Sequence, residues 1–304
     1  MPLSHAVGID LPGSRKEWAG LPCLTSPMPP RRLATVGRAL LLALLSLGVA
    51  AGCTEKRPAA GRFRPAQPGT LTVATSEIPA TGFWEGTPSQ PTGGFEWALA
   101  KSLAERFGLD RVQVVTVPFS RLVDGDLGGA DLALAELTDT AARERVLSFS
   151  VPYLPASPAV LVRNGRQVPD LAAARKLSWS VRASSTLERF LADIVRPDSP
   201  TLAVTTRDDS LKALESGRVD AVLLDLPVAA ALAGASGGRL TVASQFDTDD
   251  NLSAALPKGS VNRQAVDSAL RAFEADGTIT ELVKGSLGPG VVGTGAAPVI
   301  RTRE

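Results

Sequence analysis

The sequence predicts an α/β protein built from two lobes, and three observations support this prediction. The chain has 304 residues, which exceeds one typical domain and fits about two. Short apolar or β-branched runs alternate with segments whose apolar residues recur at helical spacing, which is the pattern of α/β sheets. This alternation runs once through residues 71–163 and starts again at residue 177. We therefore expect two α/β sheets, one in each lobe.

The first round of alternation begins with the short β-branched run "LTVAT". Apolar residues then recur at helical spacing in "EWALAKSLAERFG", and the final glycine is a helix stop. In order, the sequence predicts a strand at 71–75, a helix at 96–108, and strands at 112–118, 130–137 and 159–163.

The second round has the same character. Its apolar runs are short, and each is followed by a segment with helical spacing. We expect strands at 177–182, 201–206 and 220–225, with helices at 186–195 and 208–216 between them.

Composition and residue counts exclude several classes of function. The net charge is +1 and the basic residues form no cluster of the kind that nucleic acids require, so no nucleic-acid partner is expected. The only histidine is His5, and the only cysteines are Cys23 and Cys53. Nothing after Cys53 therefore supports a Ser-His-Asp or Cys-His mechanism or a Cys- or His-ligated metal. We expect no catalytic residues, no metal and no cofactor.

Residues 28–52 have the order of a secretory signal peptide. Basic residues follow Met28, an apolar run of 13 residues fills 39–51, and small residues precede Cys53. The run is too short to span a bilayer as a helix. The ending "AAGC" resembles the bacterial lipobox, in which the cysteine is lipidated, although Ala50 stands where Leu or Val is usual. The alternative is a simple secretory signal with an unrelated cysteine.

Three further segments are expected to lie outside the folded body. Residues 1–27 precede a well-formed signal and are predicted to be a mis-annotated upstream extension. Residues 53–69 are rich in Pro, Ala, Gly and charge, which predicts a flexible tether. Residues 288–304 have the same character and are predicted to be a disordered tail.

Six segments together resemble one known family. In order they are "LTVAT", "GGFEWALAKSLAERFGL", "ADLALAELTDTAARERVLSFSVPYL", "STLERFL", "LKALESGRVDAVLLDLPVAAAL" and "FEADGTITELVKGSLG". They resemble the bacterial extracytoplasmic solute-binding proteins of polar amino-acid ABC transporters, family 3, over about residues 70–287. The resemblance implies the type II periplasmic-binding-protein fold, in which lobe 2 is inserted in lobe 1 and two crossovers join them. Lobe 1 would comprise 70–160 and 244–287, and lobe 2 would comprise 161–243. Hinges are expected near 158–163 and 240–246.

The same resemblance implies a grip on an amino-acid zwitterion. "LTDTAAR" matches the segment in which a threonine and an arginine hold the ligand's carboxylate, here Thr138 and Arg143. A guanidinium fork suits a carboxylate because the two groups bond bidentately. Asp225 matches the acid that accepts the ligand's ammonium group. The alternatives are a solvated arginine in a helix's first turn and an ordinary turn aspartate.

A second-lobe segment completes this expected grip. "VRASSTLERF" matches the family segment whose helix N-terminus donates backbone N–H groups to the carboxylate, with Ser185 and Thr186 at the contact. Ser184 stands where the family usually has glycine. Ser185 or Thr186 as a plain helix cap is the alternative.

The expected side-chain pocket has aromatic and acidic residues. Phe83, Trp84 and Phe95 lie in segments that supply aromatic walls in the family, although Phe95 also fits a core position. Glu136 occupies a position that is usually Gly or Ser. With Glu77 and Glu96 it suggests a preference for a basic side chain, the alternative being that Glu96 is structural and the exposed acids are solvated.

These features predict an extracytoplasmic receptor rather than an enzyme. It would be anchored to the cell membrane by lipidated Cys53, capture an amino acid between its lobes and deliver it to the permease subunits of an ABC importer. Three alternatives remain on this fold: a sensor module, a dehydratase-like enzyme, and a degenerate module that binds only other proteins.

Overall fold

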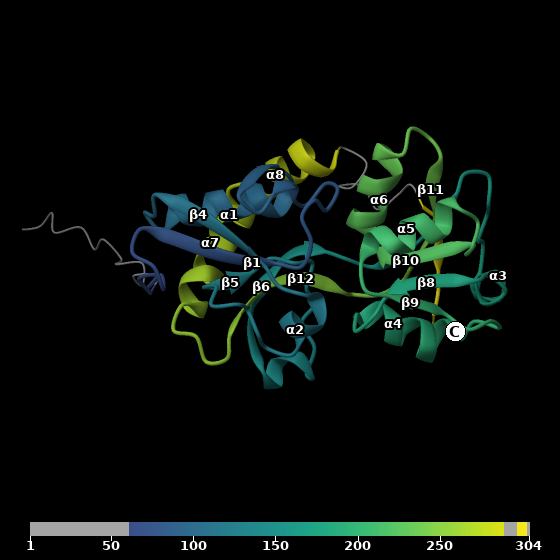
Figure 1. Cartoon of the computed structure of the whole chain (residues 1–304), viewed down its shortest axis with the longest axis horizontal. Helices are drawn as coiled ribbons and strands as arrows, with labels where there is room; N and C mark the ends of the chain where they lie inside the picture. The colour runs from purple at the N-terminus through teal and green to yellow at the C-terminus, as the bar shows by residue number, and fades with distance from the viewer. Residues whose placement is uncertain (1–60, 289–296, 303–304) are drawn as a thin grey trace, which may run out of the picture. The chain divides into compact units, whose positions relative to one another are not determined.

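A computed structural model describes residues 61–288 and 297–302 of the chain, and these residues form two large β-sheets (Figure 1). The strand orders are β4-β1-β5-β12-β6 in the first sheet and β13-β11-β7-β10-β8-β9 in the second. A separate hairpin pairs β2 (Glu85–Thr87) with β3 (Gln90–Gly93). The prediction of an α/β protein with two sheets is confirmed.

The first sheet has a parallel half and an antiparallel half. Its strands are β1 (Thr70–Thr75), β4 (Arg111–Thr116), β5 (Leu132–Ala133), β6 (Leu147–Pro155) and β12 (Asn251–Pro257). β1 runs parallel to β4 and β5, and β12 runs antiparallel to β5 and β6. All six residues of β1 are buried, as expected for a central strand covered on both faces. We call this sheet and its helices the first lobe.

The helices of the first lobe pack through their apolar faces, either on the sheet or on one another. They are α1 (Phe95–Arg106), α2 (Phe119–Val123), α7 (Arg263–Ala275) and α8 (Thr278–Leu287). α1 packs on β1 and β4, α7 packs on β6, and α8 packs on α1 and α7 (Figure 1). Gly94 precedes α1 with a φ of 103°, and a Cβ there would lie 2.2 Å from the carbonyl oxygen of Phe83. Only glycine allows this close approach.

The second sheet is built around β7 and β10. Its strands are β7 (Pro158–Arg163), β8 (Trp179–Arg182), β9 (Leu202–Val204), β10 (Ala221–Asp225), β11 (Leu240–Phe246) and β13 (Val299–Ile300). β8, β9 and β10 are parallel neighbours, whereas β7 runs antiparallel to β10 and β11. The helices are α3 (Leu171–Arg175), α4 (Thr186–Phe190), α5 (Arg207–Glu215) and α6 (Leu226–Ala235), and a π-helical turn, Leu191–Val195, continues α4. We call this sheet and its helices the second lobe.

The chain passes between the two sheets at residues 156–157 and 247–250, a few residues away from the predicted lobe boundaries. β6 ends at Pro155 and β7 begins at Pro158, while β11 ends at Phe246 and β12 begins at Asn251. The predicted boundaries at residues 160/161 and 243/244 therefore fall inside β7 and β11. Both strands belong to the second sheet along their whole length, because they pair with each other there.

The segment 61–69 is folded onto the first lobe, so this part of the predicted flexible tether is wrong. The rings of Phe63 and Phe107 stack with their centroids 4.2 Å apart, and Phe63 is buried. The backbone N–H of Arg64 donates to Asn262 Oδ1 at 2.8 Å, and that of Ala66 donates to Asp131 Oδ1 at 2.7 Å. These partners are distant in sequence, and local composition does not reveal them. Residues 1–60, with the predicted signal and Cys53, lie outside the described residues.

The end of the chain also returns to the fold. β13 pairs in parallel with β11, with Val299 opposite Gln245 and Ile300 opposite Phe246. Ile300 is 2% exposed and packs in the core of the second lobe. The expectation of a disordered tail is therefore wrong for residues 297–302. Because α8 packs on the first lobe and β13 belongs to the second, the chain crosses between the lobes a third time.

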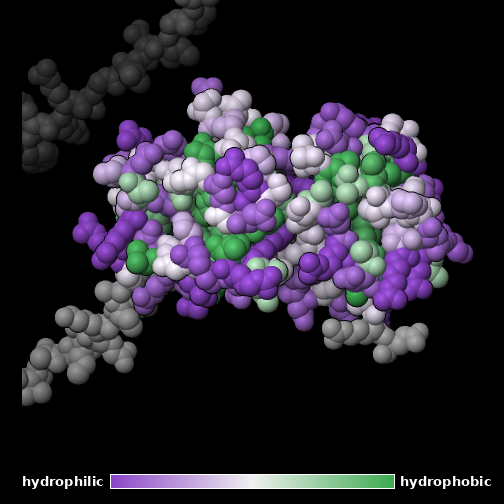
Figure 2. Space-filling model, turned by 60° about the horizontal axis from the view of Figure 1, so that its bottom comes forward, coloured by the Kyte–Doolittle hydropathy of each residue, from purple (hydrophilic) through white to green (hydrophobic). Residues whose placement is uncertain are grey.

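Hydrophilic residues cover much of the face seen in Figure 2, and hydrophobic residues gather in separate areas between them. Among the described residues, the exposed large hydrophobic side chains are Val146, Ile194, Val261 and Val299. None of the helices described is both long and apolar enough to cross a membrane.

Candidate functional site

An open cavity of about 700 Å³ lies between the two lobes. The first lobe contributes Thr138 and Arg143 to its lining, and the second lobe contributes Ser184, Ser185 and Thr186. A smaller inner cavity of about 30 Å³ shares part of this lining. Its charged residues are Glu136, Arg143, Arg182, Arg207 and Asp225. The structure therefore brings together the predicted residues Thr138, Arg143, Ser185, Thr186, Glu136 and Asp225.

Arg143 is the first residue of a 3₁₀ turn, Arg143–Arg145, and its side chain is buried between the lobes. Nη1 donates to the carbonyl oxygen of Thr138 at 2.8 Å, and Nη2 donates to that of Ser184 at 3.4 Å. Burial, and then the charge of Arg182, lowers the pKa of Arg143 to about 10. No carboxylate among the described residues forms an ion pair with it, so its charge is held only by neutral acceptors.

Ser184, in the loop before α4, has a backbone conformation that glycine adopts more easily, and glycine is the usual residue at this position in the family. Ser184 has a φ of 64°, in the left-handed region that glycine adopts without strain. Its backbone N–H donates to Glu188 Oε2 at 2.7 Å, and the Oγ of Ser185 accepts from the backbone N–H of Glu188 at 3.2 Å. Ser185 is therefore the N-cap of α4, which is the alternative considered for it. The backbone N–H of Ser185 in turn donates to the carbonyl oxygen of Arg182 at 3.3 Å.

Asp225 ends β10 and is the N-cap residue of α6, but its side chain does not cap that helix. Its carboxylate accepts no hydrogen bond from a described residue and lines the inner cavity. Burial, followed by the charges of Glu136 and Asp250, raises the pKa of Asp225 to about 7, while Arg182 and Arg207 oppose the shift. An unsatisfied carboxylate in this setting is ready to accept a cation.

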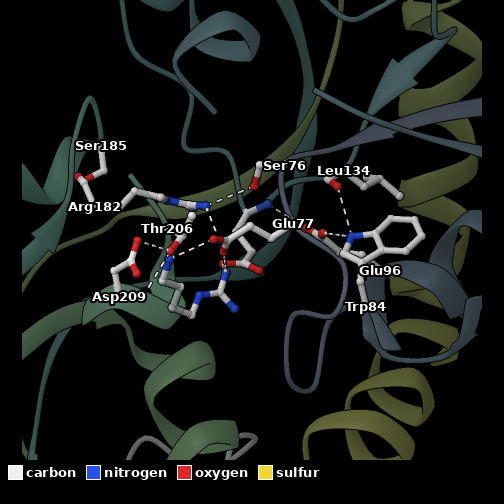
Figure 3. A network of polar contacts seen from close by, with 11 residues as sticks. Ser76, Glu77, Trp84, Glu96, Leu134, Arg182, Ser185, Thr206 and Asp209 are labelled. Carbon is white, nitrogen blue, oxygen red and sulfur yellow. Dashed lines mark hydrogen bonds and ion pairs between the residues drawn. The ribbon is translucent and has the colours of Figure 1, made fainter. Parts of the chain in front are cut away.

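Two arginines that the sequence analysis did not select also enter the cleft. Arg182 ends β8, and Arg207 begins α5 just after β9. The guanidinium of Arg182 lies 3.9 Å from the ring centroid of Phe119, and Nη1 donates to Ser76 Oγ at 3.1 Å (Figure 3). Glu77 lies 3.7 Å from the same nitrogen. A charged residue at the carboxyl end of a parallel strand was the available signal, because ligands bind at that edge of α/β sheets.

Arg207 forms a closer set of contacts with the first lobe. Its guanidinium makes an ion pair with Glu136, and its backbone N–H donates to Glu77 Oε1 at 2.9 Å. Burial opposes the charge of Arg207, but Glu136 and then Glu77 raise its pKa overall. Glu77, Glu136, Arg182 and Arg207 thus form a neutral, cross-lobe group, which we call the quartet. Because both acids are already paired, they do not support the expected preference for a basic side chain.

Glu96 is fully buried beneath this group and has a structural role. Its carboxylate accepts from Trp84 Nε1 at 2.7 Å (Figure 3), from the hydroxyl of Tyr153 at 2.5 Å and from the backbone N–H of Glu136 at 2.9 Å. Burial, and then the charge of Glu136, raises the pKa of Glu96 to about 7. Glu96 holds the backbone of Glu136, which has a φ of 54°, in the left-handed region.

The aromatic wall expected from Phe83, Trp84 and Phe95 is not formed by these residues. All three side chains are fully buried in the first-lobe core, and none lines either cavity. Phe83 and Phe95 pack edge to face with centroids 5.9 Å apart. Phe119 supplies an aromatic face to the inner cavity instead. No group of acids, histidines or cysteines in the described part of the chain is arranged to hold a metal ion.

The family model for bacterial extracellular solute-binding proteins, family 3, matches residues 71–288. The chain belongs to this family. Its two-sheet architecture is the type II periplasmic-binding-protein fold, and family 3 proteins are extracytoplasmic. The match ends at Gly288, so β13 lies beyond the part of the chain that the family model covers.

Individual relatives carry several different names. The chain is 26% identical over 261 residues to the L-cystine-binding protein TcyJ of Escherichia coli, covering 83% of this chain and 96% of that one. It is 32% identical over 197 residues to the membrane-bound lytic murein transglycosylase F of Ectopseudomonas mendocina, covering 61% of this chain. The chain spans only 39% of the length of that relative.

Among solved structures, the chain resembles an amino acid ABC transporter substrate-binding protein from Streptococcus pneumoniae bound to L-arginine. The TM-score is 0.64 and the identity is 25%, over 72% of this chain and 94% of that one. The family fold therefore extends through nearly the whole of the solved chain and most of this one.

Proposed function

We propose that this protein is an extracytoplasmic receptor that captures an amino acid between its two lobes. One observation carries the proposal. Arg143 on the first lobe and Asp225 on the second both line the cleft, and neither forms an ion pair with another described residue. Removing a charge from water is costly unless it is paired, so the buried guanidinium of Arg143 and the partly buried carboxylate of Asp225, both unpaired and opposite in sign, favour a zwitterionic ligand.

In this proposal the amino acid neutralises one group on each lobe. Its carboxylate meets the guanidinium of Arg143, assisted by the hydroxyl of Thr138, and its ammonium group meets the carboxylate of Asp225. Thr138 and Thr186 face the same cavity from opposite lobes. A solute that contacts both lobes binds the closed state better than the open state, and this difference shifts the equilibrium toward closure. The lobes would move about the connections at 156–157 and 247–250.

The proposed partners follow from family membership and from the N-terminal sequence. Family relatives include substrate-binding proteins named for amino acids and for ABC transporters. We infer that this receptor delivers its solute to the permease subunits of an ABC importer. We also infer that residues 28–52 are removed as a signal peptide and that Cys53 is lipidated, which would hold the protein at the membrane surface.

A thermal-shift screen of the mature protein against the twenty amino acids tests the proposed function. A ligand that binds only the native state stabilises it by about 2.7 kcal/mol at a hundred times its Kd. We expect one or a few L-amino acids to raise the Tm by several degrees, with the D-enantiomer as the matched control. If no amino acid raises the Tm, the receptor proposal is wrong and a degenerate protein-binding module is favoured.

An enzyme on this fold is the second candidate, because Asp225 combines a raised pKa of about 7 with access to the cavity. A carboxyl group poised near neutral pH suits general acid–base catalysis. Incubation with carboxylated ring acids, followed by chromatography of the substrate, tests this candidate. Turnover that is lost in Asp225→Asn would favour the dehydratase-like alternative over the receptor.

A further inference from the structure

Five charged side chains line the inner cavity, a sixth, Glu77, pairs with two of them, and the six charges sum to zero. The positive groups are Arg143, Arg182 and Arg207, and the negative groups are Glu77, Glu136 and Asp225. Four of them form the quartet, in which each acid of the first lobe is paired with an arginine of the second. Only Arg143 and Asp225 remain for a solute, and the proposed function assigns these to its carboxylate and ammonium groups.

Three members of the quartet, Glu136, Arg182 and Arg207, line the inner cavity together with Arg143 and Asp225, so a solute side chain that enters this cavity meets the quartet. Glu136 and Arg207 are nearly fully buried, at 4% and 6% exposure of their side chains. A cationic side chain would compete with an arginine for Glu77 or Glu136, and an anionic one would compete with Glu136 for Arg207. Either would leave a buried charge of the quartet without its partner, which is strongly unfavourable.

Two further observations describe what the side chain can be. The inner cavity has a volume of about 30 Å³, room for a group about the size of one or two water molecules, so only the end of a short side chain enters it. The Nη1 atom of Arg207 is buried and has no hydrogen-bond partner among the described residues. An unmade hydrogen bond at a buried donor is costly, and an acceptor oxygen on the solute would supply it.

We infer that the solute is an amino acid with a short, uncharged side chain that carries a hydrogen-bond acceptor, and that Arg207 is the residue that selects it. Serine, threonine and asparagine have such side chains. The inference rests on the proposed function, and it names the substrate class of the same site. Arg207 has two roles in this selection. Its Nη1 atom donates a hydrogen bond to the side chain of the solute, and its positive charge keeps the quartet neutral, which disfavours charged side chains.

Calorimetry with matched ligands tests this inference on the wild-type protein. Asparagine and aspartate have the same size and differ by one charge, so their comparison isolates the effect of charge. We expect asparagine to bind at least about thirtyfold more tightly than aspartate, and serine or threonine to bind more tightly than lysine or arginine. Tighter binding of aspartate, lysine or arginine would overturn the inference while leaving the receptor function intact. If no amino acid binds, both proposals fail.

Two variants of Arg207 separate its charge from its hydrogen bond. Arg207→Lys keeps the positive charge, so the discrimination between asparagine and aspartate should persist while asparagine binds more weakly. Arg207→Met leaves Glu136 without its partner, so the short cationic amino acid 2,4-diaminobutyrate should gain at least about tenfold relative to asparagine. Arg218→Met, at an exposed position of the second lobe, is the control and should change neither ratio. Circular dichroism confirms that each variant is folded, and unchanged ligand ratios in folded Arg207→Met would contradict the assigned role.

Discussion

Arg207 on the second lobe and Glu136 on the first form an ion pair in which both side chains are almost completely buried. Arg207 begins α5 of the second lobe and Glu136 follows β5 of the first lobe, so the pair joins one lobe to the other. Glu77 adds to this contact by accepting from the backbone N–H of Arg207. The cleft therefore contains cross-lobe contacts made entirely by the protein's own residues, in addition to groups left for a solute.

Glu136→Gln should shift the solute-free protein toward an open state. Leaving the buried Arg207 with only the more distant Glu77, at 4.0 Å, would cost up to about 3–5 kcal/mol if the lobes stayed together. Opening lets water reach the guanidinium of Arg207, so the free energy of unfolding should fall by less than that amount. We expect the open state to show a larger radius of gyration in small-angle scattering. Lys212→Gln, which breaks an exposed pair with Asp208, is the control. Superimposable scattering curves for Glu136→Gln and the wild type would argue against the cross-lobe bond.

Arg143→Ala should weaken amino-acid binding by roughly thirtyfold to a few thousandfold. Truncating one partner of a buried charge pair costs about 2–5 kcal/mol, and each 1.4 kcal/mol is tenfold in Kd. Arg271→Ala is the matched control, because Arg271 is exposed on α7 of the same lobe. Calorimetry on both variants checks the prediction. Wild-type affinity in Arg143→Ala would mean that the carboxylate is held elsewhere.

Binding should strengthen as the pH rises from about 6 to 8, because the ammonium group of the solute requires ionised Asp225. In the free protein the pKa of Asp225 is raised from 3.8 to about 7 by burial and by Glu136. A raised pKa favours the neutral form, so the stability that Asp225 contributes to the solute-free protein is present below about pH 3.8 and lost as the pH passes 7. Below pH 7 the affinity should fall by up to tenfold per unit, because binding must then displace a proton.

Asp225→Asn provides the control for this pH dependence. The variant should bind the parent amino acid weakly and with a flat pH profile between 6 and 8. Its affinity for a deaminated analogue should be reduced much less, because the analogue has no ammonium group for Asp225 to hold. An equal loss for the parent and the analogue would show that Asp225 does not hold the ammonium group.

Ile300→Ala should destabilise the second lobe although Ile300 lies four residues from the end of the chain. Its side chain is 2% exposed and packs with Phe246, and removing a buried isoleucine side chain costs about 2–5 kcal/mol. Val299→Ala is the matched control, because Val299 is 53% exposed in the same strand. Urea unfolding of both variants checks the difference. Equal midpoints would mean that β13 contributes nothing to stability.

Cys53→Ser should release the protein from the membrane fraction or leave it as unprocessed precursor. A diacylglyceryl cysteine carries two acyl chains, which suffice for stable anchoring where one chain is marginal. Fractionation and mass spectrometry of the wild type and the variant check this. The same processed mass and membrane fraction in both proteins would exclude lipidation.

The two sheets could be predicted from the sequence, and so could the lobe to which Thr138, Arg143 and Asp225 each belong. Alternating periodicity identifies strands and helices, and short motifs mark strand ends where a family binds its ligand. Arg182 and Arg207 were missed because their partners, Ser76, Glu77 and Glu136, lie on the other lobe. Pairing between side chains so distant in sequence depends on how the two lobes meet, and no local pattern encodes it.

The remaining differences have equally specific causes. Phe83, Trp84 and Phe95 are apolar positions next to the cleft, and periodicity does not distinguish a core face from a cavity wall. β13 has only two residues, which are too few to show an alternating pattern. Phe63 is buried because its ring stacks on that of Phe107, the C-cap residue of α1. Composition therefore predicted a flexible segment at each end of the folded body, whereas contacts with residues distant in sequence hold 61–69 and 297–302 in place.

The third crossing places the two ends of the folded chain on different lobes. Phe63 near one end is fixed to the first lobe by Phe107, and Ile300 near the other is fixed to the second lobe by Phe246. A pair of fluorophores at residues 62 and 302 would therefore report the separation of the lobes directly, without a probe inside the cleft. It also means that a mechanical load applied between residues 62 and 302 acts to pull the lobes apart.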